Sequence, residues 1–167
     1  MEETAENLKG AFAGESQANR RYLFFAQKAE EEGFSQVGKL FRAAAEAETV
    51  HAFNHIRIMG ETKSTPENLQ AAIAGETFEY KHMYPDYTKT AKKEKNTQAL
   101  WSFTVANQVE HVHANLFTKA MKALKTEKEP AKVDYHVCSV CGNTFENEVP
   151  SKCPICGSPK EKIFRVP

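Results

Sequence analysis

The stretch EAETVHAFNH, residues 46–55, places a glutamate and two histidines where a helix should be apolar. At helical spacing, Glu48, His51 and His55 share one stripe, which Phe41 and Ile58 extend at either end. Such a stripe is expected to face the core of a helical protein. Because an isolated buried carboxylate costs several kcal/mol, these polar residues require a compensating charge inside the fold.

The composition limits what else the chain could be. Its 167 residues suffice for one well-buried domain and a small appendage, and its 22 basic and 22 acidic residues cancel. Zero formal charge gives no electrostatic attraction toward nucleic acid or an anionic membrane. Residues 1–10 lack the apolar core of a signal peptide, and no apolar run approaches the roughly 20 residues that span a bilayer. We therefore expect a soluble, cytoplasmic protein with no nucleic-acid or membrane partner.

Helical periodicity and helix-ending residues predict four helices. The expected ranges are about Thr4–Glu32, Ser35–Met59, Thr65–Lys93 and Asn96–Lys125. The first two stop at Gly33 and Gly60. Thr65 is expected to be the N-cap of the third helix, and Tyr84-Pro85 predicts a kink inside it.

The chain changes character after the fourth predicted helix. The stretch TEKEPAK, residues 126–132, is charged and contains proline, which is typical of a linker. We therefore expect a helical domain over residues 1–125, a linker over 126–133 and a small domain over 134–167.

Carboxylates interrupt the apolar stripes of all four predicted helices. Five glutamates stand near the centres of these stripes: Glu15, Glu48, Glu76, Glu79 and Glu110. Apolar residues precede and follow them at helical spacing, so each is expected to be buried. Five carboxylates that meet inside one bundle require shared cations.

The two halves of the helical region repeat each other. AFAGES at 11–16 recurs as AIAGET at 72–77, and residues 41–52 align with residues 103–114. These offsets pair Glu15 with Glu76, Glu48 with Glu110, and His51 with His113. A pseudo-twofold axis between two copies of one helix hairpin would bring two equivalent ligand sets together. Two equivalent sets predict two metal ions.

The paired residues have the spacing of metal ligands. A glutamate and a histidine three residues later lie one helical turn apart and can reach a single inward point. One glutamate from each of two helices, with Glu-x-x-His from each of the other two, is the ligand pattern of carboxylate-bridged di-iron bundles. Four carboxylates balance the charge of two divalent ions. Oxygen and imidazole ligands without thiolate suit iron or manganese, and zinc is a possible substitute.

Several nearby residues have plainer interpretations. A single Glu-x-x-His is usually a surface pair, and His82, about 9 Å along the helix axis from Glu76, is expected to lie beyond the ligands. His55 is expected to be a hydrogen-bonded core residue or to support the ligands. Tyr22 and Tyr84 could donate hydrogen bonds to the carboxylates or be ordinary core aromatics.

Glu79 breaks the symmetry of the repeat. The aligned position in the first half is Ala18, so only the second half carries an additional carboxylate. The two metal sites are therefore predicted to be unequal.

All four cysteines lie in two Cys-x-x-Cys pairs, CSVCG at 138–142 and CPICG at 153–157. In a reducing compartment this clustering favours a metal over disulfides. Each pair forms a tight turn, the glycine after it can take a positive φ, and the four sulfurs close a tetrahedron. The ligands Cys138, Cys141, Cys153 and Cys156 suit either structural zinc or a single redox-active iron.

Over nearly its whole length the chain resembles the rubrerythrins. The motifs that carry the resemblance are AGES at Glu15, AETVHA at Glu48 and His51, AGETFEYKHMYP at Glu76 and Glu79, ANQVEHVHA at Glu110 and His113, and the rubredoxin-like CSVCG and CPICG. The resemblance implies an all-α, ferritin-like four-helix bundle with a small C-terminal rubredoxin-like domain. It also implies two non-haem irons in the bundle and favours iron over zinc at the cysteines.

The same resemblance implies a role for each ligand. Glu48 and Glu110 would bridge the two irons. Glu15 would be a terminal ligand of the first iron, and Glu76 with His113 would complete the second.

Two further pairs of residues receive roles from the resemblance. The first iron would exchange His51 for Glu79 on oxidation, because ferric iron is the harder ion and prefers carboxylate oxygen. Tyr22 and Tyr84 would lie next to the ligands and donate hydrogen bonds to them.

The implied activity is reduction of hydrogen peroxide to water. Electrons would arrive through the rubredoxin-like iron from an external donor such as rubredoxin or an NAD(P)H-dependent reductase. A ferritin-type ferroxidase is the alternative, but iron storage needs neither Glu79 nor a built-in electron donor. In a ferritin-like bundle the second and third helices run parallel, and the short link between them predicts a homodimer that exchanges helix hairpins.

Overall fold

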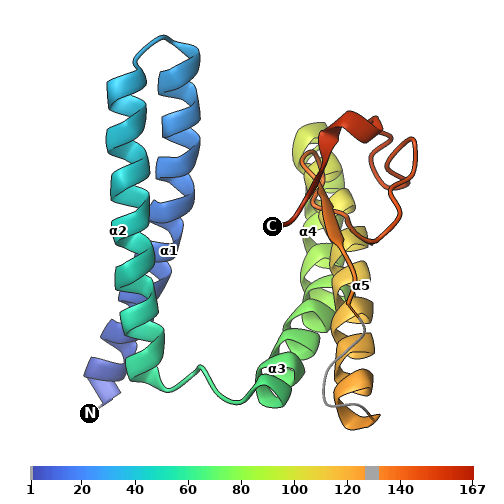
Figure 1. Ribbon diagram of the computed structural model, residues 1–167, viewed down its shortest axis with the longest axis horizontal. Helices are drawn as coiled ribbons and strands as arrows, with labels where there is room; N and C mark the ends of the chain where they lie inside the picture. The colour runs from blue at the N-terminus through green and yellow to red at the C-terminus, as the bar shows by residue number, and fades with distance from the viewer. Residues whose placement is uncertain (1, 127–131) are drawn as a thin grey trace. The chain divides into compact units, whose positions relative to one another are not determined.

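The computed structural model describes residues 2–126 and 132–167 of the chain (Figure 1). In order, its elements are α1 (Glu2–Glu31), α2 (Ser35–Met59), α3 (Thr65–Phe78), the π-helical segment η1 (Glu79–Met83), α4 (Tyr84–Lys93), α5 (Thr97–Thr126), β1 (Tyr135–Cys138), β2 (Thr144–Glu146), the 3-10 helix η2 (Lys160–Lys162) and β3 (Ile163–Arg165). The chain divides into two units, unit 1 over residues 1–63 and unit 2 over residues 64–167, and each is described by itself.

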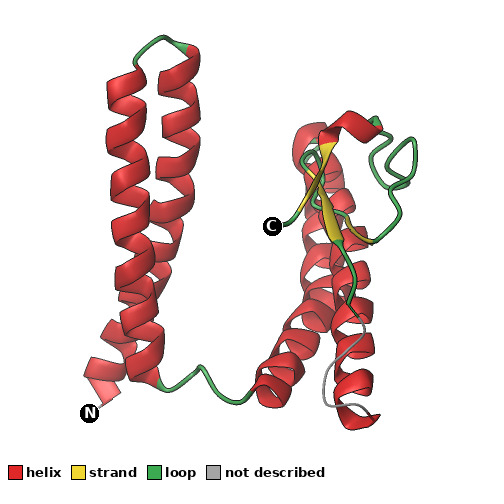
Figure 2. Ribbon diagram, in the orientation of Figure 1, coloured by secondary structure: helices red, strands yellow, loops and turns green. Residues whose placement is uncertain are grey.

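Helices make up most of the described chain, and its strands are confined to the C-terminal part (Figure 2). This confirms the predicted all-α class with a small appended domain. Among the described helices, none combines the length and the apolar character needed to cross a lipid bilayer.

Unit 1 is an antiparallel hairpin of α1 and α2 (Figure 1). Gly33 follows α1 with a left-handed φ of +86°, and its N–H donates to the carbonyl of Glu30 at 3.0 Å. Gly60 ends α2 with a φ of +69°. Both helix ends therefore lie where the sequence predicts them.

Small residues let the two helices of unit 1 approach closely. Four of its alanines are buried: Ala26, Ala29, Ala45 and Ala52. Gly38 is buried too, and a methyl group there would lie 3.2 Å from the carbonyl oxygen of Ala26 and 2.9 Å from Cγ of Glu30. The hairpin therefore depends on the absence of a side chain at position 38.

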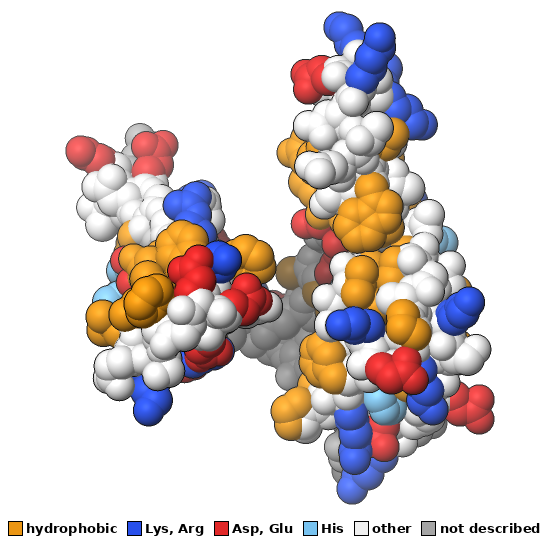
Figure 3. All heavy atoms as spheres, turned by 90° about the horizontal axis from the view of Figure 1, so that it is seen from above, with side chains coloured by type: hydrophobic (Ala, Val, Ile, Leu, Met, Phe, Trp, Pro, Cys, Tyr) orange, Lys and Arg blue, Asp and Glu red, His pale blue; other side chains and the backbone are white. Residues whose placement is uncertain are grey.

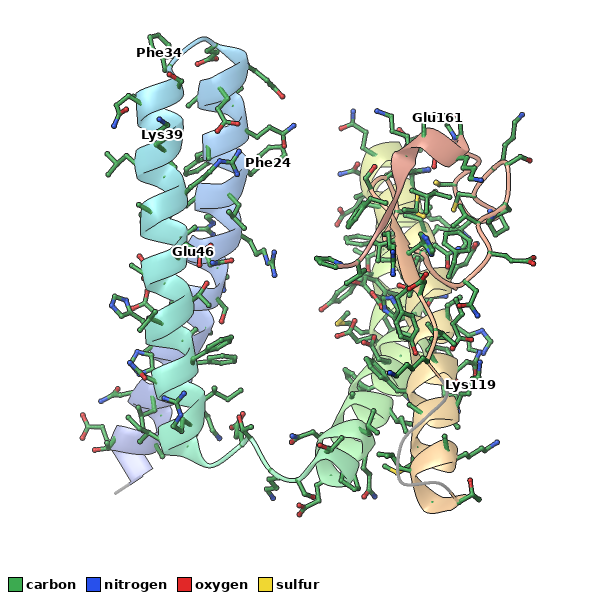
Figure 4. The ribbon with its side chains drawn as sticks, viewed as in Figure 1. Phe24, Phe34, Lys39, Glu46, Lys119 and Glu161 are labelled. Carbon is green, nitrogen blue, oxygen red and sulfur yellow. The ribbon has the colours of Figure 1, made fainter. Side chains whose placement is uncertain are left out.

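Large apolar side chains remain exposed on this hairpin taken by itself (Figures 3 and 4). They include Phe24, Phe34, Leu40, Phe53 and Ile58. Ile58 was predicted to lie on a buried stripe, yet it is 69% exposed in the hairpin. The reason is geometric: two helices share a single interface, so each covers only one side of the other. Exposed apolar surface of this extent is typical of a structure that associates with another one.

The helical part of unit 2 begins with a capping box. Ser64 is the N-cap of α3, and its backbone N–H donates to the carboxylate of Glu67 at 3.2 Å. Thr65, the predicted N-cap, is instead the first helical residue, because the Ser-x-x-Glu pattern starts one position earlier. Pro66 lies in the first turn, where its missing N–H is not needed.

The predicted kink near Tyr84-Pro85 takes the form of the π-helical segment η1, which connects α3 to α4. The N–H of Tyr84 donates to the carbonyl of Glu79, five residues earlier. Pro85 has no N–H to donate, and in an α-helix its ring would crowd the carbonyl of Lys81. A wider turn relieves this contact, and such turns are frequent at functional sites.

Helix α5 starts one residue after Asn96, whose Oδ1 accepts the N–H of Ala99 at 3.0 Å. The helix ends at Thr126, within one residue of the predicted end. Most of the predicted linker, residues 126–133, lies outside the described residues.

The C-terminal residues of unit 2 form a three-stranded antiparallel sheet in the order β2-β1-β3. Val137 of β1 pairs with Thr144 of β2 on one side and with Phe164 of β3 on the other. The sheet lies beside α5 (Figure 1), and Lys119 of α5 forms an ion pair with Glu146 of β2. This arrangement places the cysteine-bearing loops close to α5.

Candidate metal centres

Cluster 1 lies in unit 1 and consists of Glu15 on α1 with Glu48 and His51 on α2. One ligand atom from each residue lies within 4.8 Å of the others. Nδ1 of His51 is 3.0 Å from Oε2 of Glu48, the contact expected for positions i and i+3. The side chain of Glu48 is 17% exposed and that of His51 is 54% exposed. In the hairpin by itself, cluster 1 is therefore open on its histidine side.

Asn19 joins the two helices beside cluster 1. Its Nδ2 donates to the carbonyl of Ala45 at 2.7 Å and to Oγ1 of Thr49 at 2.9 Å. Asn19 follows Glu15 by one helical turn, and Thr49 directly follows Glu48, so these bonds hold the two carboxylates in register. No role for Asn19 was predicted from the sequence, although a polar amide among apolar neighbours on the stripe is a signal that could have indicated one.

Cluster 2 lies in unit 2 and consists of Glu76 on α3 with Glu110 and His113 on α5. Its ligand atoms also converge within 4.8 Å. Nδ1 of His113 is 2.8 Å from Oε2 of Glu110 and 3.9 Å from Oε1 of Glu76. The cluster has the same three residue types on the same helix positions as cluster 1, as the sequence repeat predicts.

Cluster 2 concentrates negative charge. Burial, together with a hydrogen bond to Glu110 and repulsion from Glu110 and Glu79, raises the pKa of Glu76 to about 7. Burial also raises the pKa of Glu79, and the charge of Glu110 adds to this effect while His113 opposes it. A divalent cation would replace this repulsion with attraction, so the electrostatics of the donor set fit a metal.

Glu79 is the first residue of η1, and Tyr84 directly follows its last residue. Burial and the negative charges of cluster 2 raise the pKa values of both side chains. The ligand atoms of Glu79 do not converge with those of the cluster, but its carboxylate is close enough for Glu110 to raise its pKa. The pKa of Tyr84 is raised by burial and then by the charges of Glu110, Glu79 and Glu76. Its ring packs against Phe103, with 6.3 Å between ring centroids.

Three other residues considered in the sequence analysis contribute no ligand atom to a cluster within residues 2–126 and 132–167. Tyr22 packs against Phe41 of the facing helix, with 6.1 Å between ring centroids. His82 is exposed and lies 5.7 Å from the ring of Phe78. His55 is half-buried on α2.

The four cysteines converge in the C-terminal part of unit 2 as free thiols. The Sγ atoms of Cys138 and Cys156 are 3.7 Å apart, and those of Cys141 and Cys153 are 3.6 Å apart. A tetrahedral site with metal–sulfur bonds of about 2.3 Å has edges of about 3.8 Å. The four sulfurs therefore already have the spacing that a single ion requires.

Glycines shape both cysteine turns. Gly142 has a φ of +83° and Gly157 a φ of +72°, as the sequence predicts. Their N–H groups donate to the carbonyls of Cys138 and Cys153, each at 2.8 Å. Because a side chain is strained at these φ values, glycine allows each turn to present its two thiols together.

Ser158 contacts two of the thiols, a role that the sequence analysis missed. Its Oγ lies 3.2 Å from Sγ of Cys138 and 2.9 Å from Sγ of Cys156. Burial opposes ionisation of Cys138, but hydrogen bonds from Ser158 and from backbone amides lower its pKa to about 6. Against the effect of burial, Ser158 also lowers the pKa of Cys156, whereas burial raises the pKa of Cys141. Lowered thiol pKa values favour the thiolate, which is the metal-binding form.

Known proteins with related sequences support this geometry. The family model described as rubrerythrin matches residues 6–121, and the model for the rubrerythrin rubredoxin-like domain matches residues 136–163. Rubrerythrin-2 of Clostridium acetobutylicum is 36% identical, over 96% of this chain and 95% of its own length. Nigerythrin of Nitratidesulfovibrio vulgaris is 35% identical, over 95% of this chain and 84% of its own length.

Solved structures of nigerythrin show the same likeness. A mixed-valent state aligns with a TM-score of 0.58 and 34% identity, and covers 98% of this chain and 86% of that chain. A fully reduced, all-ferrous state aligns with the same TM-score and 33% identity. The glutamates and histidines of a di-iron site and the four cysteines of a rubredoxin-like site are all present here. The chain therefore belongs to the rubrerythrin family, a family of iron-dependent oxidoreductases.

Proposed function

We propose that this protein protects against oxidative stress by reducing hydrogen peroxide to water at a pair of irons. Each peroxide consumes two electrons and two protons and yields two waters. The electrons enter through an iron held by the four cysteines. The chain is thus a non-haem di-iron peroxidase with its own electron-entry domain.

The single observation that carries this proposal is the placement of Glu79 beside cluster 2. This carboxylate has no counterpart in the first half, and it lies at the first residue of a π-helical segment. Burial and the charge of Glu110 raise its pKa, so the metal-free protein disfavours the charged form, which a cation at cluster 2 would favour. Iron storage needs no such additional ligand, whereas a redox cycle with two ligand arrangements does.

The proposed ligand set takes residues from both clusters. By analogy with the family, Glu48 and Glu110 would bridge the two irons. Glu15 would bind the first iron and Glu76 the second. His113 would complete the second iron through Nδ1, the ring nitrogen that lies 2.8 Å from Glu110.

His51 and Glu79 are the exchangeable ligands in this proposal. His51 is more exposed than Glu48, so turning it away from cluster 1 disturbs little packing. Glu79 would replace it after oxidation, because ferric iron prefers carboxylate oxygen to imidazole. This ligand exchange would explain why the second half of the sequence repeat has Glu79 where the first half has Ala18.

Bound iron supplies the electrons that cleave the oxygen–oxygen bond of peroxide. The residues around it hold protons and orient the ligands. The raised pKa of Tyr84 keeps its phenol protonated, so the hydroxyl stays available as a hydrogen-bond donor toward the carboxylates of cluster 2. Tyr22 is proposed to donate a hydrogen bond at cluster 1.

The electron donor to the cysteine-bound iron is proposed to be external, such as rubredoxin or an NAD(P)H-dependent reductase. Four free thiols are typical of a reducing compartment, and we propose a cytoplasmic location. The proposed functional division is a di-iron domain over residues 1–125, a linker over 126–133 and an electron-entry domain over 134–167.

We also propose a homodimer in which two chains exchange their α1–α2 hairpins. Helix α2 is about 37 Å long at 1.5 Å per residue, whereas the link over residues 60–64 spans roughly 20 Å when fully extended. That link is too short to return along α2, as a bundle with parallel second and third helices demands. Exchange removes this mismatch and gives the exposed apolar side chains of each hairpin a surface to pack against. Sedimentation as a monomer at micromolar concentration would rule out the exchanged dimer.

Stopped-flow mixing of the fully reduced protein with either peroxide or dioxygen tests the proposed activity. We expect peroxide to oxidise the iron pair much faster than dioxygen does. Faster oxidation by dioxygen would instead support a ferritin-type ferroxidase, the alternative class for this bundle.

The Glu79→Ala variant places an alanine at position 79, the same residue type as at the aligned position of the first half of the repeat, Ala18. We expect this variant to bind iron but to lose the preference for peroxide over dioxygen. Glu161→Ala is the matched control, since Glu161 is an exposed carboxylate of η2 (Figure 4). A Glu79→Ala variant with an unchanged preference would remove the role assigned to Glu79.

A further inference from the structure

The imidazole of His113 contacts the cysteine-bearing domain of its own chain. Nε2 of His113 lies 3.0 Å from Oγ1 of Thr144, the first residue of β2. The other ring nitrogen, Nδ1, lies among the carboxylates of cluster 2. One side chain therefore connects cluster 2 with a strand that begins three residues after Cys141.

A metal bound at Nδ1 of His113 would leave Nε2 as the nitrogen that carries the ring proton. Oγ1 of Thr144, 3.0 Å from Nε2, can accept that hydrogen bond while its own proton points toward the carbonyl of Gly142, 3.4 Å away. Thr144 is therefore placed to support the tautomer that binds a metal through Nδ1.

Two further observations place β2 and its preceding loop next to α5. Gly142 lies so near α5 that a methyl group added to it would be 3.8 Å from Cγ1 of Val109, which is buried. Lys119, which projects from α5 in Figure 4, forms an ion pair with Glu146 at the end of β2. An ion pair with an exposed lysine contributes little to stability.

We propose that Thr144 is a positioning residue that fixes the tautomer and orientation of His113 when a metal binds at Nδ1. This role rests on the proposed function in that cluster 2 holds a metal.

The tautomer is measured on the full chain loaded with zinc, which is diamagnetic, with ¹⁵N-labelled histidine. Long-range ¹H–¹⁵N spectra should show Nδ1 of His113 bound to metal and Nε2 protonated. Thr144→Val keeps the branched shape but removes the hydroxyl. It should change the Nε2 signal of His113 and weaken zinc binding at cluster 2 by about 10-fold or more, measured after the cysteine site is filled. Thr144→Ser should restore both values.

A matched control is Thr104→Val, because Oγ1 of Thr104 donates only within α5, to the carbonyl of Leu100. Thr104→Val should leave both readouts unchanged. The positioning role is refuted when Thr144→Val leaves the His113 signals and the zinc affinity at their wild-type values, or when Thr144→Ser fails to restore them.

A wild-type protein that does not react with peroxide would refute the proposed function, while the zinc and NMR measurements would still decide the role of Thr144.

Discussion

Removing the charge of Glu76 should make the metal-free protein more stable at neutral and alkaline pH. In the folded, metal-free state the pKa of this carboxyl is raised from 4.5 to about 7 by burial and by its neighbours Glu110 and Glu79. Between these two pH values the folded state holds a proton that the unfolded state has lost. The free energy of unfolding therefore falls as pH rises from about 4.5 to about 7.

The size of this loss follows from the shift. One pKa unit corresponds to about 1.4 kcal/mol, so the shift from 4.5 to about 7 sets an upper limit of about 3.5 kcal/mol for Glu76. Because the carboxyl is partly open to solvent, screening reduces the expected effect to roughly 1 to 2 kcal/mol. Glu76→Gln keeps the shape and cannot ionise, so it should exceed the wild type by this amount near pH 8 and match it near pH 4.5.

Urea unfolding followed by circular dichroism, with metal removed by a chelator, measures this difference across the pH range. Glu161→Gln, an exposed change in the same unit, is the control and should follow the wild type. With iron or zinc bound, the order of wild type and Glu76→Gln should reverse, because a cation stabilises the carboxylate. A Glu76→Gln variant that tracks the metal-free wild type at every pH would refute the electrostatic account of cluster 2.

Three further predictions concern single positions. Cys138→Ser should remove the visible band of the ferric tetrathiolate site and lower the iron content from three to two per chain, measured by metal analysis. Gly38→Ala should destabilise the protein by about 1 to 3 kcal/mol, because the added methyl group overpacks against α1. Gly10→Ala, whose methyl group would lie in open space on α1, should stabilise the protein by about 0.5 to 1 kcal/mol. Urea unfolding of both variants measures these differences. Pro85→Ala restores an N–H that can bond to the carbonyl four residues earlier. A crystal structure of this variant should therefore show η1 as α-helix. A retained π-helical segment would contradict the role given to proline.

Several features of the protein follow from local sequence patterns. The period of the apolar residues and the positions of Gly33 and Gly60 predict helices whose ends lie within a few residues of the observed ends. The sequence repeat pairs His51 with His113, and the structure gives each the same Nδ1 contact with a glutamate three residues earlier. These predictions succeed because helix geometry fixes which residues share a face, without reference to the rest of the fold.

The sequence alone also indicates the cysteine site. Two Cys-x-x-Cys pairs with a following glycine form local turns, so their geometry depends little on distant residues. The observed sulfur spacing agrees with this expectation. The choice between zinc and iron could not follow from ligand type, because both ions accept four thiolates.

Only the tertiary structure decided how these parts act on one another. The bond between His113 and Thr144 joins residues that are far apart in the sequence, and no periodic pattern indicates such a contact. The pKa of Glu76 depends on burial and on two other carboxylates brought near by folding. The exposure of Ile58 depends on which faces of two helices meet. Periodicity and ligand spacing are properties of one segment, whereas burial, charge coupling and contacts between segments exist only once the chain has folded.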